Sequence, residues 1–322
     1  MLLKNQIQEL FRQNSNYNNP SQAVNLASSL DTLSSDLYTD SNRFIYELLQ
    51  NADDSCKTIN PIKVWVRLFE NDLVIAHTGS AFSDLDVRGI CNINNGTKRS
   101  DLTKTGYKGI GFKAVFGQSK KVTIYSDNEY FSFDSSYDHN WKWDGSQKEW
   151  EIENDRKFSM PWQIIPIYSE KEDLSRDVTK FIKAVGANVA TIISLSNTDE
   201  TMEAIRTITQ NPNTFIFLKN ICQINFDLSN KNVIKIIRGE ENIISVQQND
   251  KKSQQWLVTE KKLLIPNYLR PLLIDEKNFP EKLLEATEIQ LTLAAKIGED
   301  GLSKLSDNDQ RVFALSLIHI SE

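Results

Sequence analysis

The chain has 322 residues, more than the roughly 100 to 200 residues of one ordinary domain, so its length predicts two units. Its content of 39% hydrophobic and 25% charged residues is typical of a globular protein and argues against a largely disordered chain. A formal charge of -6 and a pI near 5.3 provide no global attraction to nucleic acid or to an anionic membrane, so neither partner is indicated.

The sequence also has no features of a metal-binding protein or of a membrane protein. The cysteines and histidines are scattered, without a CxxC pair or an HExxH spacing, so we expect neither a transition-metal cage nor a disulfide framework. No apolar run approaches the roughly 20 residues that cross a bilayer. These features predict a cytoplasmic protein.

The first third of the chain is predicted to form helices around one β-hairpin. Residues 62–69 and 72–76 alternate like strands, with a tight turn at Glu70 and Asn71 between them. Ser41 is a suitable N-cap for the helix that precedes them. Apolar spacing predicts helices over residues 2–13, 20–35, 41–54 and 84–91.

The middle of the chain alternates helices and strands. Residues 92–105 are polar, basic and small, so we expect a mobile loop there. Residues 135–160 carry three tryptophans among polar residues and are interpreted as an insertion between strands. We predict helices over 111–116, 170–184 and 198–208, and strands over 121–126, 130–134 and 189–195.

A second unit is predicted to follow the first domain, which would span residues 1–230. It would be a partial α/β domain over residues 231–315, and residues 316–322 resemble a translated sequencing adapter, so we interpret them as a non-native tail. Its strands are expected at 233–238, 242–246, 256–264 and 289–295, with a further strand over 307–315.

The helix over residues 41–54 has one face suited to chemistry. Glu47, Gln50, Asn51 and Asp54 fall within roughly a third of its circumference, and apolar residues lie opposite. Neighbours at i and i+4 would let Asn51 hold Mg²⁺ while Glu47 orients a water, as phosphate hydrolysis requires. The alternative is an ordinary amphipathic surface helix with solvated polar groups.

A glycine-rich loop precedes the helix expected at 111–116. Phosphate could reach the backbone N–H groups of this loop, because glycine has no side chain in the way at positions 106, 109 and 111 (Gly106, Gly109 and Gly111). Lys108 or Lys113 would add positive charge. The spacing GxxGxG is neither the Rossmann nor the Walker pattern. A tight turn is the alternative.

The preceding polar segment contains two cations. Lys98 and Arg99 lie in a stretch of small and polar residues that we interpret as a lid able to fold over a bound polyphosphate. Solvation of both side chains is the alternative.

Together, these blocks resemble the GHKL superfamily of ATPases. Their order matches that family: the helix with Glu47 and Asn51, a strand ending in a turn at His77 and Gly79, the glycine-rich lid, and a strand with Thr191. The segments Glu-Leu-Leu-Gln-Asn-Ala-Asp-Asp and Thr-Gly-Tyr-Lys-Gly-Ile-Gly-Phe-Lys are most similar to the sacsin-like branch.

The resemblance covers residues 20–230 and implies an α+β fold of the Bergerat type. It places helices on one face of a mixed β-sheet, ATP between the helices and the lid, and a transducer-like α/β domain after them. Implied roles are a general base (Glu47), a Mg²⁺ ligand (Asn51), support for the site (Asp54), contact near adenine (Thr191), and a phosphate cradle from the amides of Gly109, Ile110, Gly111 and Phe112.

One position departs from the family. His77 stands where the family has an aspartate that accepts from the adenine amine, and a neutral imidazole nitrogen can also accept if the other nitrogen carries the proton. A histidine packed only for shape is the alternative. Gly79 is kept, whereas Ala81 replaces the second glycine of the turn, which should reduce its freedom.

The implied function is that of a chaperone-like ATPase module which binds ATP and Mg²⁺, closes its lid and hydrolyses ATP in the intact protein. Because the second domain, which completes the catalytic site in the family, breaks off here, we expect binding with little turnover. Alternatives are a nucleotide-binding scaffold without turnover and a DNA-transaction ATPase. The resemblance also allows protein clients, fused effector domains and a nucleotide-dependent dimer.

Overall fold

The computed structural model describes residues 3–37, 43–57, 60–92, 111–228, 231–264, 288–299 and 301–303. These residues form two compact units. The first comprises the described residues up to Pro212 and those from Leu218 to Ile234, and the second comprises Asn213–Phe217 and the described residues from Lys235 onward.

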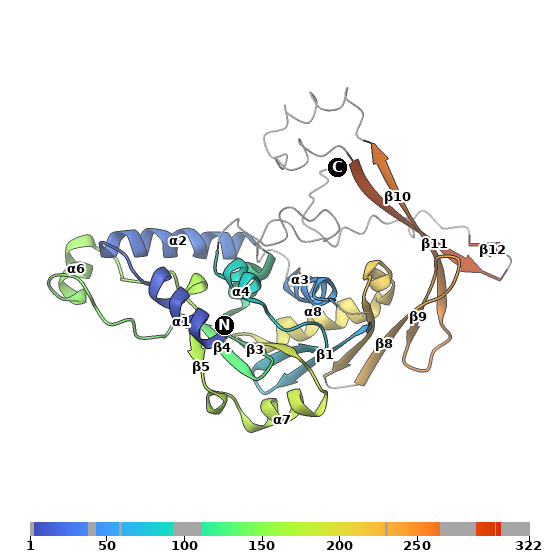
Figure 1. Ribbon diagram of the computed structural model, residues 1–322, viewed down its shortest axis with the longest axis horizontal. Coiled ribbons are helices and arrows are strands. Elements are labelled where there is room, and N and C mark those ends of the chain that lie inside the picture. Colours follow the sequence, from blue (N-terminus) through green and yellow to red (C-terminus); the bar gives the residue numbers. More distant parts are fainter. Residues whose placement is uncertain are drawn as a thin grey trace. The chain divides into compact units, whose positions relative to one another are not determined.

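The first unit is built on a mixed β-sheet, as the sequence predicted (Figure 1). Its strand order is β7-β1-β2-β6-β3-β4-β5, in which β1 and β7 are parallel and the other neighbours are antiparallel. The strands β5 and β7 were not expected from the sequence. The strands are β1 (Ile62–Phe69), β2 (Asp72–His77), β3 (Ser119–Ser126), β4 (Glu129–Asp134), β5 (Ile167–Ser169), β6 (Val189–Leu195) and β7 (Ile221–Asp227).

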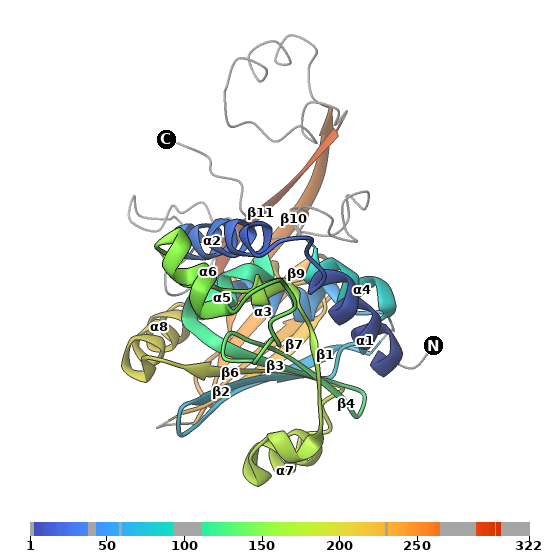
Figure 2. The same ribbon diagram turned by 90° about the vertical axis from the view of Figure 1, so that its left-hand side faces the viewer.

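Helices pack on both sides of this sheet, so the expectation of helices on one face is wrong. One helix, α7, lies opposite α1, α2, α3 and α4 (Figure 2). No helix among the described residues is both long and apolar enough to cross a membrane. The helices are α1 (Leu3–Asn14), α2 (Pro20–Leu37), α3 (Arg43–Asp54), α4 (Asp84–Cys91), α5 (Val115–Gln118), α6 (Gln147–Asn154), α7 (Arg176–Ala184) and α8 (Thr198–Gln210), with 3₁₀ turns η1 (Gly111–Ala114), η2 (Trp162–Ile164) and η3 (Lys171–Asp173).

The position of α7 follows from its apolar stripe. Val178, Phe181 and Ile182 recur at helical spacing and pack into one cluster with Ala190 and Ile192 of β6. Successive residues of a strand point to opposite faces, so the other face of β6 is left for the helices that include α3.

The predicted hairpin turn at Glu70 and Asn71 is confirmed. Phe69 pairs with Asp72, so the loop between β1 and β2 has two residues, and Glu70 has a φ of 50°. This tight connection sets the register that brings His77 opposite Val64.

The tryptophan-rich insertion packs on the N-terminal helices. Trp141, Trp143 and Phe158 form edge-to-face pairs, and the Trp143 indole nitrogen donates to the carbonyl of Tyr17 at 3.1 Å. Phe158 and Trp143 border the buried cluster that contains Leu30 of α2. The insertion therefore extends the hydrophobic core.

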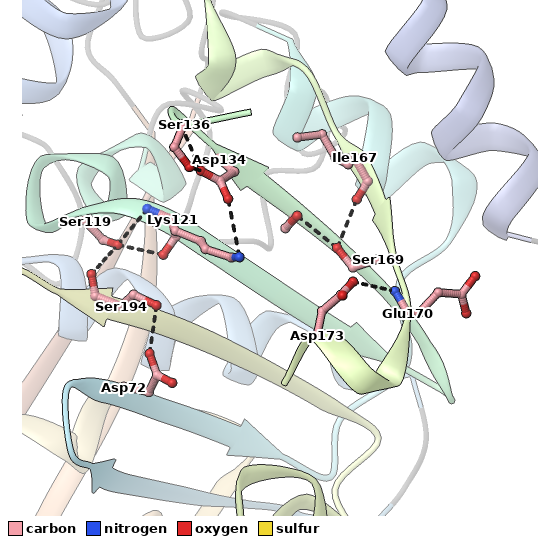
Figure 3. A network of polar contacts seen from close by, with 11 residues as sticks. Asp72, Ser119, Lys121, Asp134, Ser136, Ile167, Ser169, Glu170, Asp173 and Ser194 are labelled. Atoms are coloured by element: carbon pink, nitrogen blue, oxygen red, sulfur yellow. Dashed lines mark hydrogen bonds and ion pairs between the residues drawn. The ribbon is translucent and has the colours of Figure 1, made fainter. Parts of the chain in front are cut away.

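Hydrogen bonds fix the sheet at the Asp72 end of β2 (Figure 3). Ser194 Oγ donates to the Asp72 carboxylate at 2.7 Å, and Ser119 Oγ donates to the Ser194 carbonyl at 2.6 Å. The pairing of β3 with β6 shifts register between Ser119 and Val122, so these bonds satisfy groups beside the irregularity. The opposite end of β2, at His77, carries the candidate site.

The second unit contains neighbouring strands in the order β12-β11-β10-β9-β8, of which β8 belongs to it only from Lys235 onward. The pairs β9 with β10, β10 with β11 and β11 with β12 are antiparallel. The strand expected over 307–315 and the tail over 316–322 lie outside the described residues. The strands are β8 (Lys231–Arg238), β9 (Ile243–Gln248), β10 (Gln254–Leu264), β11 (Glu288–Gly298) and β12 (Gly301–Leu302).

Candidate functional site

The C-terminal end of α3 meets the turn that follows β2. The Ser80 amide donates to the carbonyl of Ser55 at 3.2 Å, and Ser55 lies directly after the helix. The turn therefore places His77 and Gly79 beside the helix that carries Glu47 and Asn51.

Gly79 is required by this close approach. An ideal Cβ there would lie 1.9 Å from Ser55 Oγ and 2.8 Å from His77 Nδ1. Its φ is not in the left-handed region, so lack of space explains the glycine, and the backbone freedom suggested by the sequence does not.

Gly79→Ala is expected to lower the free energy of unfolding by about 2 kcal/mol, because the new methyl group must displace Ser55 Oγ. That oxygen donates to the Ala52 carbonyl at 2.6 Å, so its displacement also strains the end of α3. Urea denaturation measures the loss.

Two further variants isolate the clash. Adding Ser55→Gly should recover part of the loss, because it removes the contacted hydroxyl. Gly239→Ala is the control, since its Cβ would meet only a carbonyl oxygen at 3.5 Å. Equal losses for Gly79→Ala and Gly239→Ala would contradict the steric explanation.

Asn188 clamps the same turn from the start of β6. Its side-chain amide donates to the carbonyls of Thr78 and Gly79, both at 3.1 Å, and its backbone amide donates to the His77 carbonyl at 3.0 Å. Lys63 of β1 exchanges two hydrogen bonds with Thr78. Bonds from neighbouring strands therefore hold the turn in one conformation.

His77 is buried at the end of β2, with 8% of its surface exposed. Its Nδ1 accepts a hydrogen bond from the Gly79 amide at 3.1 Å. Burial lowers the pKa of His77 to about 4, so the ring is neutral near pH 7 and its proton sits on Nε2. The unprotonated nitrogen, which was expected to accept from the adenine amine, thus already accepts from the Gly79 amide.

Thr191 lies near His77 on the same face of the sheet. His77 pairs with Val189 and Ile75 pairs with Thr191, so His77 and Thr191 are diagonal neighbours on adjacent strands. Thr191 is buried, with 6% of its surface exposed. Two residues that the sequence placed at one site are therefore close in the fold.

The polar face of α3 is more covered than the sequence analysis expected. Glu47 and Gln50 are 9% and 4% exposed, while Asn51 and Asp54 are half-buried. An ordinary solvated surface helix does not fit this burial. Gln50 Nε2 is buried, and no acceptor contacts it within the described part of the chain.

Asp53, which the sequence analysis did not single out, anchors α3. Its carboxylate accepts from the backbone amides of Lys219, Asn220 and Ile221 at 2.7 to 2.8 Å, and it is 6% exposed. The Asn220 side chain also donates to the Asp53 carbonyl at 2.9 Å. The neighbouring Asp54 remains on the face of Glu47.

The end of the glycine-rich loop packs against α3. The 3₁₀ turn η1 begins at Gly111 and contacts both α3 and α2, and the Phe112 side chain is buried against Phe116. The helix expected over 111–116 is instead η1 followed by α5. The remaining loop residues assigned from the sequence lie outside the described residues: Lys98, Gly106, Lys108, Gly109 and Ile110.

Lys113 is a structural cation, so of the two lysines expected to add charge near phosphate it is not the one that does so. Its ammonium is buried and donates to the carbonyls of Ile90 and Gln163. Burial lowers the pKa of Lys113 to about 8. Ile90 lies in the last turn of α4 and Lys113 lies in η1, so this side chain joins the segments on either side of the expected lid.

Known proteins resemble part of this chain. A segment of 117 residues is 34% identical to Protein NO VEIN of Arabidopsis thaliana, and a segment of 105 residues is 32% identical to human Sacsin. They cover 36% and 29% of this chain, but only 4% and 2% of those two proteins. The sacsin domain matches residues 34–238, more than half of the chain, and the protein therefore belongs to the sacsin-domain family.

Proposed function

We propose that the first unit is a Bergerat-type site of the GHKL superfamily that binds a nucleoside triphosphate with Mg²⁺, ATP being the ligand that the resemblance implies. One observation carries the proposal: the end of β2 and η1 both lie against α3. These are the segments that supply His77, the glycine-rich loop and the pair Glu47 and Asn51.

The residues of α3 fit a metal-bound triphosphate. Glu47 and Asn51 offer hard oxygen atoms one helical turn apart, and the buried amide of Gln50 on the same face has no acceptor within the described residues. The described residues contain no group of three acidic, cysteine or histidine side chains that could hold a metal ion. That suits Mg²⁺, which proteins often bind through one or two ligands together with substrate phosphates.

Each residue then has a defined task. Asn51 would hold Mg²⁺ through its carboxamide oxygen, the metal would neutralise the phosphates, and Glu47 would take a proton from the attacking water. Asp54 supports this face of the helix, while Thr191 and His77 contact the base. In this proposal the amides at Gly109, Ile110, Gly111 and Phe112 would receive phosphate together with Gly106, and Lys98 and Lys108 would supply positive charge.

Hydrolysis to ADP and phosphate belongs to the intact protein in this proposal. The chain spans 4% and 2% of the two relatives, so the wider roles are proposed from the family resemblance. In this proposal the protein is a cytoplasmic, chaperone-like module that acts on protein clients or fused effector domains. It would form a dimer that depends on nucleotide. A scaffold that binds without turnover, or a DNA-stimulated ATPase, would be distinguished by product formation with and without duplex DNA.

Asn51→Ala is expected to weaken ATP binding at least about tenfold with Mg²⁺ and to remove the dependence of affinity on Mg²⁺, because the variant loses the metal ligand. Glu47→Ala should retain Mg²⁺-dependent binding and lose any turnover of ATP. Calorimetric titration with ATP, with and without Mg²⁺, measures binding.

Two exposed positions provide matched controls, Asn140→Ala for the amide and Glu153→Ala for the carboxylate. Both should bind as the wild type does. If Asn51→Ala keeps the full Mg²⁺ dependence, the site assignment is wrong. Absence of binding of every nucleoside triphosphate by the wild type would reject the proposed function itself.

A further inference from the structure

The His77 ring presents a hydrogen-bond donor at the end of β2. Nδ1 accepts from the Gly79 amide at 3.1 Å, so it carries no proton, and a neutral imidazole must then carry its proton on Nε2. Asn188, Lys63 and Ser55 hold the turn that contains Gly79, so the fold favours this tautomer. Within the described residues, no acceptor contacts Nε2.

The location of this donor gives it a role in the site. His77 is the diagonal neighbour of Thr191 on the sheet face that α3 shares, and its turn contacts the residue after α3. A base bound beside Thr191 would therefore lie next to the His77 side chain, whose other ring nitrogen is the Nε2–H donor. This placement rests on the proposed function, in which the site takes a nucleoside triphosphate with Mg²⁺.

We propose that His77 makes the site favour 6-oxopurine nucleotides, with guanine or hypoxanthine as the base, over adenine nucleotides. Position 6 of guanine and hypoxanthine is a carbonyl that accepts from an N–H group. Position 6 of adenine is an amine, so two donors would face each other and both would lose a partner. The substituent at position 6 is an acceptor in both guanine and hypoxanthine and a donor in adenine. This difference determines the preference for 6-oxopurine nucleotides over adenine nucleotides.

Two substitutions of equal size separate polarity from shape. The Nδ1 contact runs from residue i to the amide of i+2, a bond that Asp and Asn side chains also make. In His77→Asn the carboxamide oxygen can accept from the Gly79 amide, as Nδ1 does. The NH₂ group then remains as a donor, in place of Nε2–H. In His77→Asp the second oxygen is an acceptor, which reverses the polarity.

Calorimetric titration of the whole chain with MgATP, MgGTP and MgITP tests the preference. The wild type and His77→Asn should bind GTP and ITP on the order of tenfold more tightly than ATP, and His77→Asp should bind ATP most tightly. ITP lacks the 2-amino group, so agreement between GTP and ITP assigns the effect to position 6.

The outcomes distinguish this inference from the function on which it rests. If the wild type prefers ATP, and His77→Asp leaves that preference unchanged, the role of His77 is rejected while nucleotide binding stands. If no variant binds any of the nucleotides, both are rejected.

The tautomer can also be read without a nucleotide. In protein labelled with ¹⁵N-histidine, the signals that disappear in His77→Asn belong to His77. Near pH 7 they should show an unprotonated Nδ1 and a protonated Nε2. A protonated Nδ1 or a charged ring would overturn the inference.

Discussion

Asp53→Ala is expected to lower the free energy of unfolding by about 4 kcal/mol. The carboxylate accepts three backbone hydrogen bonds at 2.7 to 2.8 Å while almost fully buried. Alanine would leave the amides of Lys219, Asn220 and Ile221 without that acceptor. Buried donors that lose a charged acceptor are costly because water cannot replace it.

Urea denaturation, followed by far-UV circular dichroism, measures this loss. Asp53→Asn keeps one oxygen and should lose less than Asp53→Ala, while Glu153→Ala on the exposed face of α6 should unfold like the wild type. A loss below about 1 kcal/mol for Asp53→Ala would show that water or another group satisfies the three amides.

The position of Asp53 also affects the site. It joins the last turn of α3 to the start of β7, and β7 pairs in parallel with β1. Release of this connection would free the end of the helix that carries Asn51 and Asp54. A variant that remains folded is therefore expected to bind nucleotide more weakly as well.

Elements with strong periodicity could be predicted from the sequence. The strand expected over 189–195 is β6, and the helix expected over 84–91 is α4, which Ser83 and Asp86 cap reciprocally. Local patterns determine such elements, because side-chain alternation and capping act over a few residues.

Long-range relations could not be predicted in the same way. The pattern of α7 indicates an apolar stripe but not which sheet face covers it, and β7 pairs with β1, about 160 residues earlier in the chain. The expected helices on one side of the sheet were therefore only part of the arrangement.

In the candidate site, too, local patterns could be predicted from the sequence and long-range contacts could not. Sequence spacing correctly placed Gln50 on the face of Glu47, but it did not show that this face is largely covered. Lys113 was one of two lysines expected to add charge near phosphate because it lies beside glycines, whereas its ammonium donates to two carbonyls in the interior. Burial and carbonyl contacts depend on segments far apart in the chain, so motif reasoning missed them.

Acid is expected to destabilise the wild-type protein more steeply than His77→Asn. Burial lowers the pKa of His77 from 6.5 to about 4. Above pH 6.5 the ring is neutral in both states, and below that value the unfolded chain binds a proton that the folded chain does not. The free energy of unfolding therefore falls as the pH falls, by about 3 kcal/mol in total, and the contribution ends below the folded pKa.

The difference between the two proteins isolates this histidine. Urea denaturation measures the free energy of unfolding of both proteins between about pH 7 and about pH 4. Over this range the free energy of unfolding of His77→Asn minus that of the wild type should rise by about 3 kcal/mol, since asparagine does not titrate. Carboxylates and His139, whose pKa burial also lowers, are common to both proteins and cancel in the difference. Parallel curves over this range would mean that His77 takes up its proton as readily in the folded protein as in the unfolded chain, and the Gly79 contact could not then be holding Nδ1 unprotonated.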